Sequence, residues 1–169
     1  EHCAADVRQS MTTNNLKLND SKTEVVVITS KNNVQHVDTI RVKIGEVTIK
    51  PKPVARNLGA NIDCHLTMEP QVNAVTSSMY YHIRRISKVK YHLTQEARAK
   101  AINCTVLSRL DYHNGLLLGA PERSIRKLQV AQNSAARLLT GTSRREHITP
   151  VLQHLHWLPV WQRISFKIL

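Results

Sequence analysis

Residues 68–90 read MEPQVNAVTSSMYYHIRRISKVK. Apolar side chains recur there three or four positions apart, the period of an amphipathic α-helix, at Val72, Val75, Met79, Ile83 and Ile86. Upstream of residue 63, apolar residues alternate with polar ones or form short runs, which is typical of strands. We therefore expect an α+β protein, in which a small antiparallel β lobe (residues 1–66) precedes an all-helical lobe (residues 67–169).

Two more helices are predicted downstream by the same spacing. The first follows Thr94, whose hydroxyl is suited to an N-cap, and has an apolar face formed by Ala99, Ile102, Val106 and Leu110. The second begins near Pro121 and ends at Gly141, and its apolar face consists of Ile125, Leu128, Ala135 and Leu138.

The end of the chain predicts two shorter helical pieces. One covers residues 148–154 with Pro150 at its start, and the other begins at Pro159 or Val160 and continues to the last residue. Trp157 and Trp161 are interpreted as packing anchors for these helices. The last helix stops within its amphipathic pattern and the first residues have no cap, so both ends suggest a piece of a larger protein.

The β lobe is expected to open with a helix over residues 4–14 and a connector over 16–20. A strand is predicted over 22–29, where the β-branched run VVVI indicates that both faces are covered. A polar loop over 30–37 follows, and a second strand over 40–44 alternates apolar and basic residues, so it should be half-buried.

The sequence Gly45-Glu46 predicts a two-residue hairpin turn of type II′. The return strand contains Val47 and Ile49 and is ended by prolines at positions 51 and 53, because proline cannot donate to a ladder. A last short strand is predicted over 55–62, interrupted by Gly59, where another backbone is expected to come close.

Charge limits the function more than length does. The chain has 169 residues, with 24 Lys or Arg against 12 Asp or Glu, a net charge of +12. Residues 64–169 hold fifteen of the basic and five of the acidic residues. This asymmetry favours a polyanionic partner, most simply nucleic acid. A membrane surface is disfavoured because no helix sets a broad Trp, Phe or Leu face against its basic face. The absence of targeting signals, with this partner, favours the cytoplasm or nucleus.

Several chemistries find no support in the residues. The three Cys form no CxxC pair and are interpreted as small core residues. Of the nine His, only Cys64-His65 and the His154/His156 pair cluster, without the spacing of a metal site, so no metal is expected. No paired acids suit two-metal chemistry and no glycine-rich phosphate loop follows a strand.

Basic side chains interleaved with aromatic ones are the stronger signal. Arg84, Arg85, Lys88 and Lys90 occupy the polar side of the first long helix, near Tyr80, Tyr81, His82 and Tyr91, and Arg98 and Lys100 follow. A second group comprises Arg123, Arg126, Lys127, Arg137, Arg144 and Arg145. We expect phosphate contacts with occasional base stacking, without readout of base sequence. The alternatives are a solvated basic surface, and core packing for Tyr80 and Tyr81.

An ordered set of segments resembles the reverse transcriptases of non-long-terminal-repeat (LINE-type, jockey-like) retrotransposons. Residues 15–24 (NLKLNDSKTE) are similar to the segment after the catalytic centre, and residues 56–63 (RNLGANID) to the primer-grip region. Further segments are similar to the thumb and linker that follow in these enzymes: SRLDY at 108–112, LGAP at 118–121, QNSAAR at 132–137, LHWLPV at 155–160, Arg163 and FKIL at 166–169.

The resemblance implies the palm edge and thumb of an RNA-directed DNA polymerase. Lys22 would match the lysine proposed to protonate the departing pyrophosphate, and Leu58 and Gly59 would place the primer end. The metal-binding carboxylates would lie upstream, so Mg²⁺ is expected only in the full-length enzyme and this chain alone should be inactive. The implied partners are the RNA and DNA of a template–primer duplex and the upstream fingers and palm of the same polyprotein.

Two other hypotheses remain open. The chain could be a stand-alone basic helical module that binds nucleic acid or another protein. It could also be a translated remnant of a mobile element with no function of its own.

Overall fold

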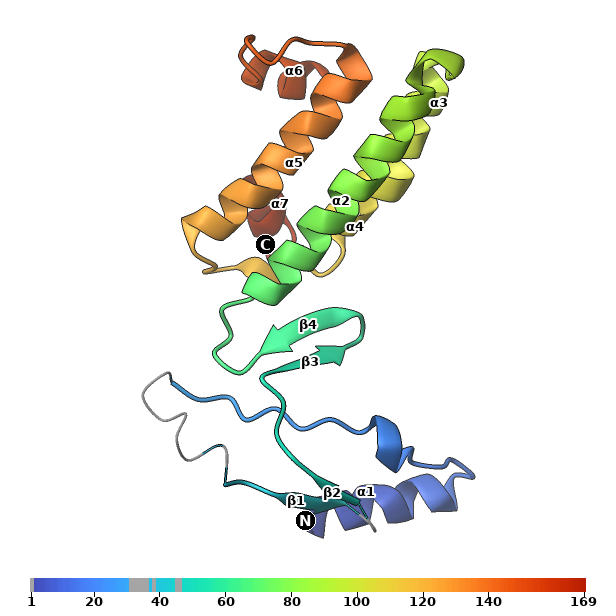
Figure 1. Cartoon of the computed structure of the whole chain (residues 1–169), viewed down its shortest axis with the longest axis vertical. Coiled ribbons are helices and arrows are strands. Elements are labelled where there is room, and N and C mark those ends of the chain that lie inside the picture. Colours follow the sequence, from blue (N-terminus) through green and yellow to red (C-terminus); the bar gives the residue numbers. More distant parts are fainter. Residues whose placement is uncertain (1, 31–36, 38, 45–46) are drawn as a thin grey trace. The chain divides into compact units, whose positions relative to one another are not determined.

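The computed structural model of the chain describes residues 2–30, 37, 39–44 and 47–169 (Figure 1). The chain divides into two compact units, Glu1–Leu66 and Thr67–Leu169. The first contains two small antiparallel sheets and the second is helical, so the predicted α+β class is confirmed. The sharp change in apolar period near residue 63 lies close to the boundary between the units.

The first unit begins with helix α1, and its strands form two separate two-stranded antiparallel sheets. Its elements are α1 (His2–Thr13), the 3-10 turn η1 (Asp20–Lys22), β1 (Val42–Ile44), β2 (Val47–Ile49), β3 (Val54–Asn57) and β4 (Ala60–Asp63). The predicted helix, the half-buried strand and its return strand are confirmed, with Val42 opposite Ile49. The predicted turn at Gly45-Glu46 lies outside the described residues.

The prediction of a strand over residues 22–29 is wrong. Lys22 lies in η1, and the segment after it is extended without a ladder. Two isolated backbone hydrogen bonds connect it to other segments, from the Lys52 N–H to the Val25 carbonyl (2.8 Å) and from the Thr29 N–H to the Cys64 carbonyl (2.9 Å). The two partner residues, Lys52 and Cys64, precede and follow the β3–β4 hairpin in the sequence, and the strands of that hairpin pair with each other. The segment is also not covered on both faces, since Ile28 is 60% exposed.

The single interrupted strand predicted over 55–62 is a hairpin. β3 and β4 pair with Asn57 opposite Ala60, which leaves Leu58 and Gly59 as a two-residue turn. Both turn residues have positive φ, 47° and 88°, as a type I′ turn requires. Gly59 is therefore needed for the turn itself and not, as predicted, for close approach of another backbone.

The second unit packs its helices around one apolar core. Its elements are α2 (Glu69–Val89), η3 (Lys90–His92), α3 (Gln95–Ile102), a π-helical turn η4 (Asn103–Leu107), α4 (Ser108–Asp111), η5 (Asn114–Leu117), α5 (Glu122–Thr140), α6 (Thr149–His154) and α7 (Val160–Phe166). Figure 1 shows α2 and α5 side by side and parallel, and α3 and α4 run back along α2 from its C-terminal end toward the segment before α5.

The apolar faces predicted for the long helices are the ones that form this core. Val72 and Met79 of α2, Ile102 of α3 and Leu128 of α5 are completely buried. Val75, Ala99 and Leu138 are half-buried and pack against the core. Thr94 is the predicted N-cap, with its hydroxyl accepting from the Ala97 N–H (3.2 Å), and Gly141 ends α5 at φ 78°.

Two predictions about burial are wrong. Trp157 packs against the core, but Trp161 is 52% exposed because Val160 and Ile164 supply the buried side of α7. Cys3 and Cys104 are exposed rather than core residues. Cys104 lies between Ile102 and Val106, which already occupy the inward side of that turn.

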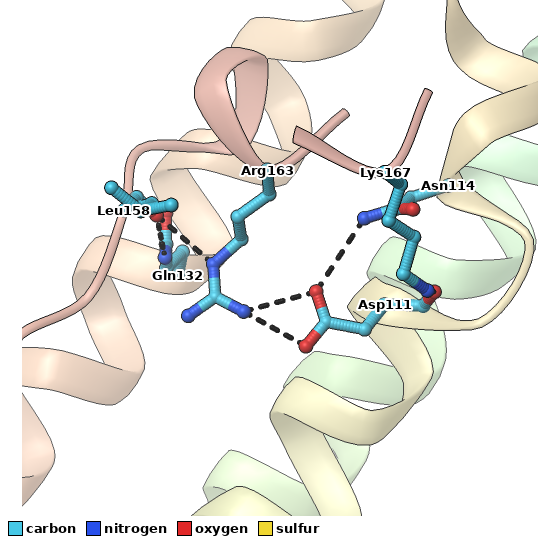
Figure 2. Close-up of polar contacts among 6 residues, drawn as sticks. All are labelled: Asp111, Asn114, Gln132, Leu158, Arg163 and Lys167. Atoms are coloured by element: carbon cyan, nitrogen blue, oxygen red, sulfur yellow. Dashed lines mark hydrogen bonds and ion pairs between the residues drawn. The ribbon is translucent and has the colours of Figure 1, made fainter. Parts of the chain in front are cut away.

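An ion pair joins α7 to the end of α4 (Figure 2). The Arg163 guanidinium donates to both carboxylate oxygens of Asp111, at 2.9 and 2.8 Å. The Lys167 ammonium donates to the Asp111 carbonyl. The Arg163 side chain is only 16% exposed and that of Asp111 36% exposed, so this pair is partly withdrawn from water.

The same guanidinium also reaches the loop before α7 (Figure 2). Arg163 Nε donates to the Leu158 carbonyl at 2.9 Å, and the completely buried Gln132 of α5 donates to that carbonyl at 2.8 Å. A second amide of α5, Gln129, accepts from the Val160 N–H at 2.8 Å. These bonds give the buried polar groups partners and fix α7 against α5.

Candidate nucleic-acid interface

Acidic residues are confined to the helix ends and loops of the second unit, all of which the structure describes. The five are Glu69, Glu96, Asp111, Glu122 and Glu146. Beyond its first residue, neither α2 nor α5 contains an acid. Basic side chains on the outer faces of these two helices therefore have few carboxylates to neutralise them.

Three exposed cations gather in the C-terminal half of α2. Arg84 and Lys88 are four residues apart and share one strip of the helix surface. Arg85 donates to the Tyr81 hydroxyl at 3.1 Å, and its guanidinium lies 5.5 Å from the centre of the Tyr81 ring. None of the three forms an ion pair within the described residues. Tyr81 is exposed, and Tyr80 is half-buried and packs against the core.

Half of the second basic group, Arg123, Arg126 and Lys127, lies in the N-terminal half of α5. A groove between α2 and α5 is lined by Thr76, Tyr80, Arg123, Arg126, Lys127 and Val130. Arg123 is paired with Glu69 at 2.6 Å, and the Lys127 ammonium donates to the Asn73 amide oxygen at 3.0 Å. Arg126 has no ion pair in the described part of the chain. The structure thus places the sequence-predicted pair Arg126 and Lys127 along one shallow groove.

Three of the candidate basic residues are engaged in local contacts. The half-buried Arg98 guanidinium donates to the carbonyls of Lys90 (2.9 Å), Leu93 (3.5 Å) and Leu139 (3.5 Å), and so ties the ends of α2 and α5 together. Lys100 is paired with Glu96 at 2.6 Å, and the Lys90 ammonium lies 4.7 Å from the centre of the Tyr91 ring. We therefore assign Arg98 to the fold rather than to the interface.

The remaining arginines of the second group lie around the end of α5. Arg137 donates to the carbonyls of Ser143 (3.1 Å) and Glu146 (2.8 Å), which fixes the loop after the helix. Arg144 and Arg145 are exposed on that loop. They are far along α5 from Arg126 and belong to a different part of the surface.

One cation of this surface was missed by sequence reasoning. Arg109 is exposed on α4, and its charge, like that of Arg85, acts on His82 of α2. Burial, and then the charges of Arg109 and Arg85, hold the pKa of His82 below its ordinary value. The sequence predicted the helix that carries Arg109 but gave no signal for this cluster, because only the packing of that helix on α2 brings Arg109 there.

A polyanion bound over this cluster should raise the pKa of His82. Phosphate charge would offset that of Arg85 and Arg109 and favour the protonated ring, so the imidazole takes up a proton on binding. We expect an NMR titration of the His82 ring to shift to higher pH when nucleic acid is added. Sodium chloride at matched ionic strength, without nucleic acid, is the control. An unchanged titration would place the bound polyanion elsewhere.

The candidate residues of the first unit are exposed. Lys22 ends η1, and Leu58, which is 79% exposed, stands with Gly59 at the tip of the β3–β4 hairpin. Between Lys22 and the hairpin, Glu24 is paired with Lys52 at 2.6 Å. The Lys52 ammonium, as hydrogen-bond donor and as charge, holds the pKa of the Glu24 carboxyl below its ordinary value.

The described residues contain neither a metal-binding cluster nor a membrane-spanning helix. No three His, Cys, Asp or Glu side chains there are grouped so that they could hold a metal ion. The His65 ring bonds the Thr29 carbonyl through Nδ1 at 2.8 Å. Among the same residues, no helix has both the length and the apolar character needed to cross a membrane.

No protein family model, curated protein or solved structure matches the chain.

Proposed function

We propose that the chain is the palm-edge and thumb portion of a LINE-type reverse transcriptase and binds a template–primer duplex through its phosphates. One observation supports the binding part above all. The outer faces of α2 and α5 carry exposed cations, and no carboxylate lies on either helix beyond its first residue. A surface of this kind suits the regular negative charge of a nucleic-acid backbone and is indifferent to base sequence.

The duplex-binding residues in this proposal are Arg84, Arg85 and Lys88 of α2 and Arg126 and Lys127 of α5. Tyr81 adds an aromatic face beside Arg85, where an unpaired base could stack. The exposed Lys22 would act as general acid toward pyrophosphate, and the turn at Leu58 and Gly59 would support the primer end. Mg²⁺ would be held by carboxylates on upstream polypeptide, and this chain would supply duplex positioning and the Lys22 proton.

A salt series tests the proposal. Fluorescence anisotropy would compare a labelled RNA–DNA hybrid with its separate strands between about 50 and 300 mM salt, where phosphate contacts give a steep dependence. We expect a dissociation constant in the micromolar range that weakens steeply with salt and does not depend on sequence. An affinity that stays constant over this range would exclude phosphate contact as the basis of binding.

The stand-alone module is the second candidate, because the helical unit has a hydrophobic core of its own. The same experiment separates the two. Binding of the hybrid that is tighter than binding of either strand supports the thumb proposal. Equal binding of all three supports a general nucleic-acid-binding module, and no binding at low salt supports the remnant hypothesis.

A further inference from the structure

The groove between α2 and α5 differs from the convex basic face of α2 because it is a shallow depression with both apolar and cationic walls. Val130 and the half-buried Tyr80 form its apolar part. Arg123, Arg126 and Lys127 supply the charge. A shallow depression with a few converging polar groups suits a single small chemical group rather than a whole small ligand.

The charge in the groove is that of a site for a dianion. Glu69 neutralises Arg123, at 2.6 Å. Arg126 and Lys127 have no carboxylate partner in the described residues, which leaves two positive charges. The Lys127 ammonium is held in place by the neutral Asn73 amide at 3.0 Å. A phosphate monoester carries about −1.5 to −2 at neutral pH, whereas a backbone phosphodiester carries a single charge.

A buried hydroxyl in the groove also lacks a partner. Thr76 lines the groove, and its Oγ1 is buried without a hydrogen bond to any described residue. An unsatisfied buried hydroxyl costs stability in the free protein. If the side chains that cover this hydroxyl move aside on binding, a phosphate oxygen in the groove would give it the acceptor that it lacks.

We propose that this groove binds the terminal phosphate monoester of a nucleic-acid strand. Arg126 and Lys127 would hold the phosphate oxygens, and Asn73 positions the Lys127 ammonium. The Tyr80 ring and Val130 would pack against the terminal sugar. This inference rests on the proposed function in one respect, since both require that the chain binds nucleic acid. It adds a preference for strand ends, which contacts with the phosphates of a continuous backbone would not produce.

Two short single strands of one sequence, with a 5′-phosphate and with a 5′-hydroxyl, test the groove. We expect the full chain to bind the phosphorylated strand roughly tenfold more tightly, the effect of one or two additional charge-assisted hydrogen bonds. Arg126→Gln and Lys127→Gln should each reduce this ratio toward one. Arg84→Glu with Lys88→Glu should weaken both strands equally and leave the ratio unchanged. Circular dichroism would establish that each variant is folded.

Thr76→Val supplies an independent readout. Loss of the unpartnered hydroxyl should raise the denaturant midpoint and at the same time lower the preference for the phosphorylated strand. Equal affinity for the two strands, with hybrid binding still steep in salt, would overturn the groove assignment and leave the proposed function intact. A preserved 5′-phosphate preference with salt-independent hybrid binding would overturn the proposed function and leave the groove assignment intact.

Discussion

Arg84→Glu combined with Lys88→Glu is expected to weaken binding of an RNA–DNA hybrid by roughly 100-fold at moderate salt. Each reversal removes one phosphate contact and adds a repulsion, and we take each reversal to cost somewhat more than about 1 kcal/mol at an exposed site. The two side chains share one strip of α2 and have no ion pair in the described residues, so the substitutions break no ion pair within the protein. The slope of affinity against salt should also fall.

Arg144→Glu with Arg145→Glu is the matched control. This pair carries the same charge change on an exposed loop beyond the end of α5. If net charge alone attracts the hybrid, both double variants lose affinity equally, and the localised interface is wrong. If the interface lies on α2, the loop variant loses much less. Titrations at several salt concentrations give both quantities, affinity and slope.

Asp111→Ala is expected to lower the free energy of unfolding of the helical unit by about 2 kcal/mol. Asp111 accepts two bonds from Arg163, and the change leaves that guanidinium, only 16% exposed, without its carboxylate. The residual bond from Arg163 Nε to Leu158 cannot neutralise its charge. The effect is smaller than for a fully buried pair because Asp111 is partly open to water.

Tryptophan fluorescence in a denaturant series measures this loss directly. Both tryptophans, Trp157 and Trp161, lie in the helical unit, so the signal reports that unit alone. Glu96→Ala is the control, since it removes an acid from an ion pair whose side chains are 74% and 77% exposed. The control should cost about 0.5 kcal/mol or less. Equal losses in both variants would contradict the assignment of Asp111 as an anchor of α7.

The helical unit was predictable because its information is local. Apolar residues at helical spacing, Thr94 before one helix and Gly141 after another each fix an element without reference to the rest of the chain. The β unit was less predictable, because a strand exists only where another backbone faces it. The run Val25 to Ile28 has the composition of a strand, but its segment forms isolated backbone hydrogen bonds instead of a ladder.

The candidate interface was predictable in part for a similar reason. The sequence pattern placed the cations on α2 and α5, but it could not show which of these side chains have local partners. Arg98 has the same charge as Arg84, yet its guanidinium is bound by carbonyls from three segments. Arg109 joins His82 only through the packing of α4 on α2. Such contacts follow from tertiary structure, which a linear pattern does not contain.

The position of a bound hybrid is the central question, and NMR mapping answers it most directly. Backbone amide signals of the isotope-labelled chain would be followed as an RNA–DNA hybrid is added. We predict that the largest changes occur in the C-terminal half of α2, around Arg84 and Lys88, and around Arg126 of α5. Changes spread evenly over all helices, or centred on α6 and α7, would contradict the account.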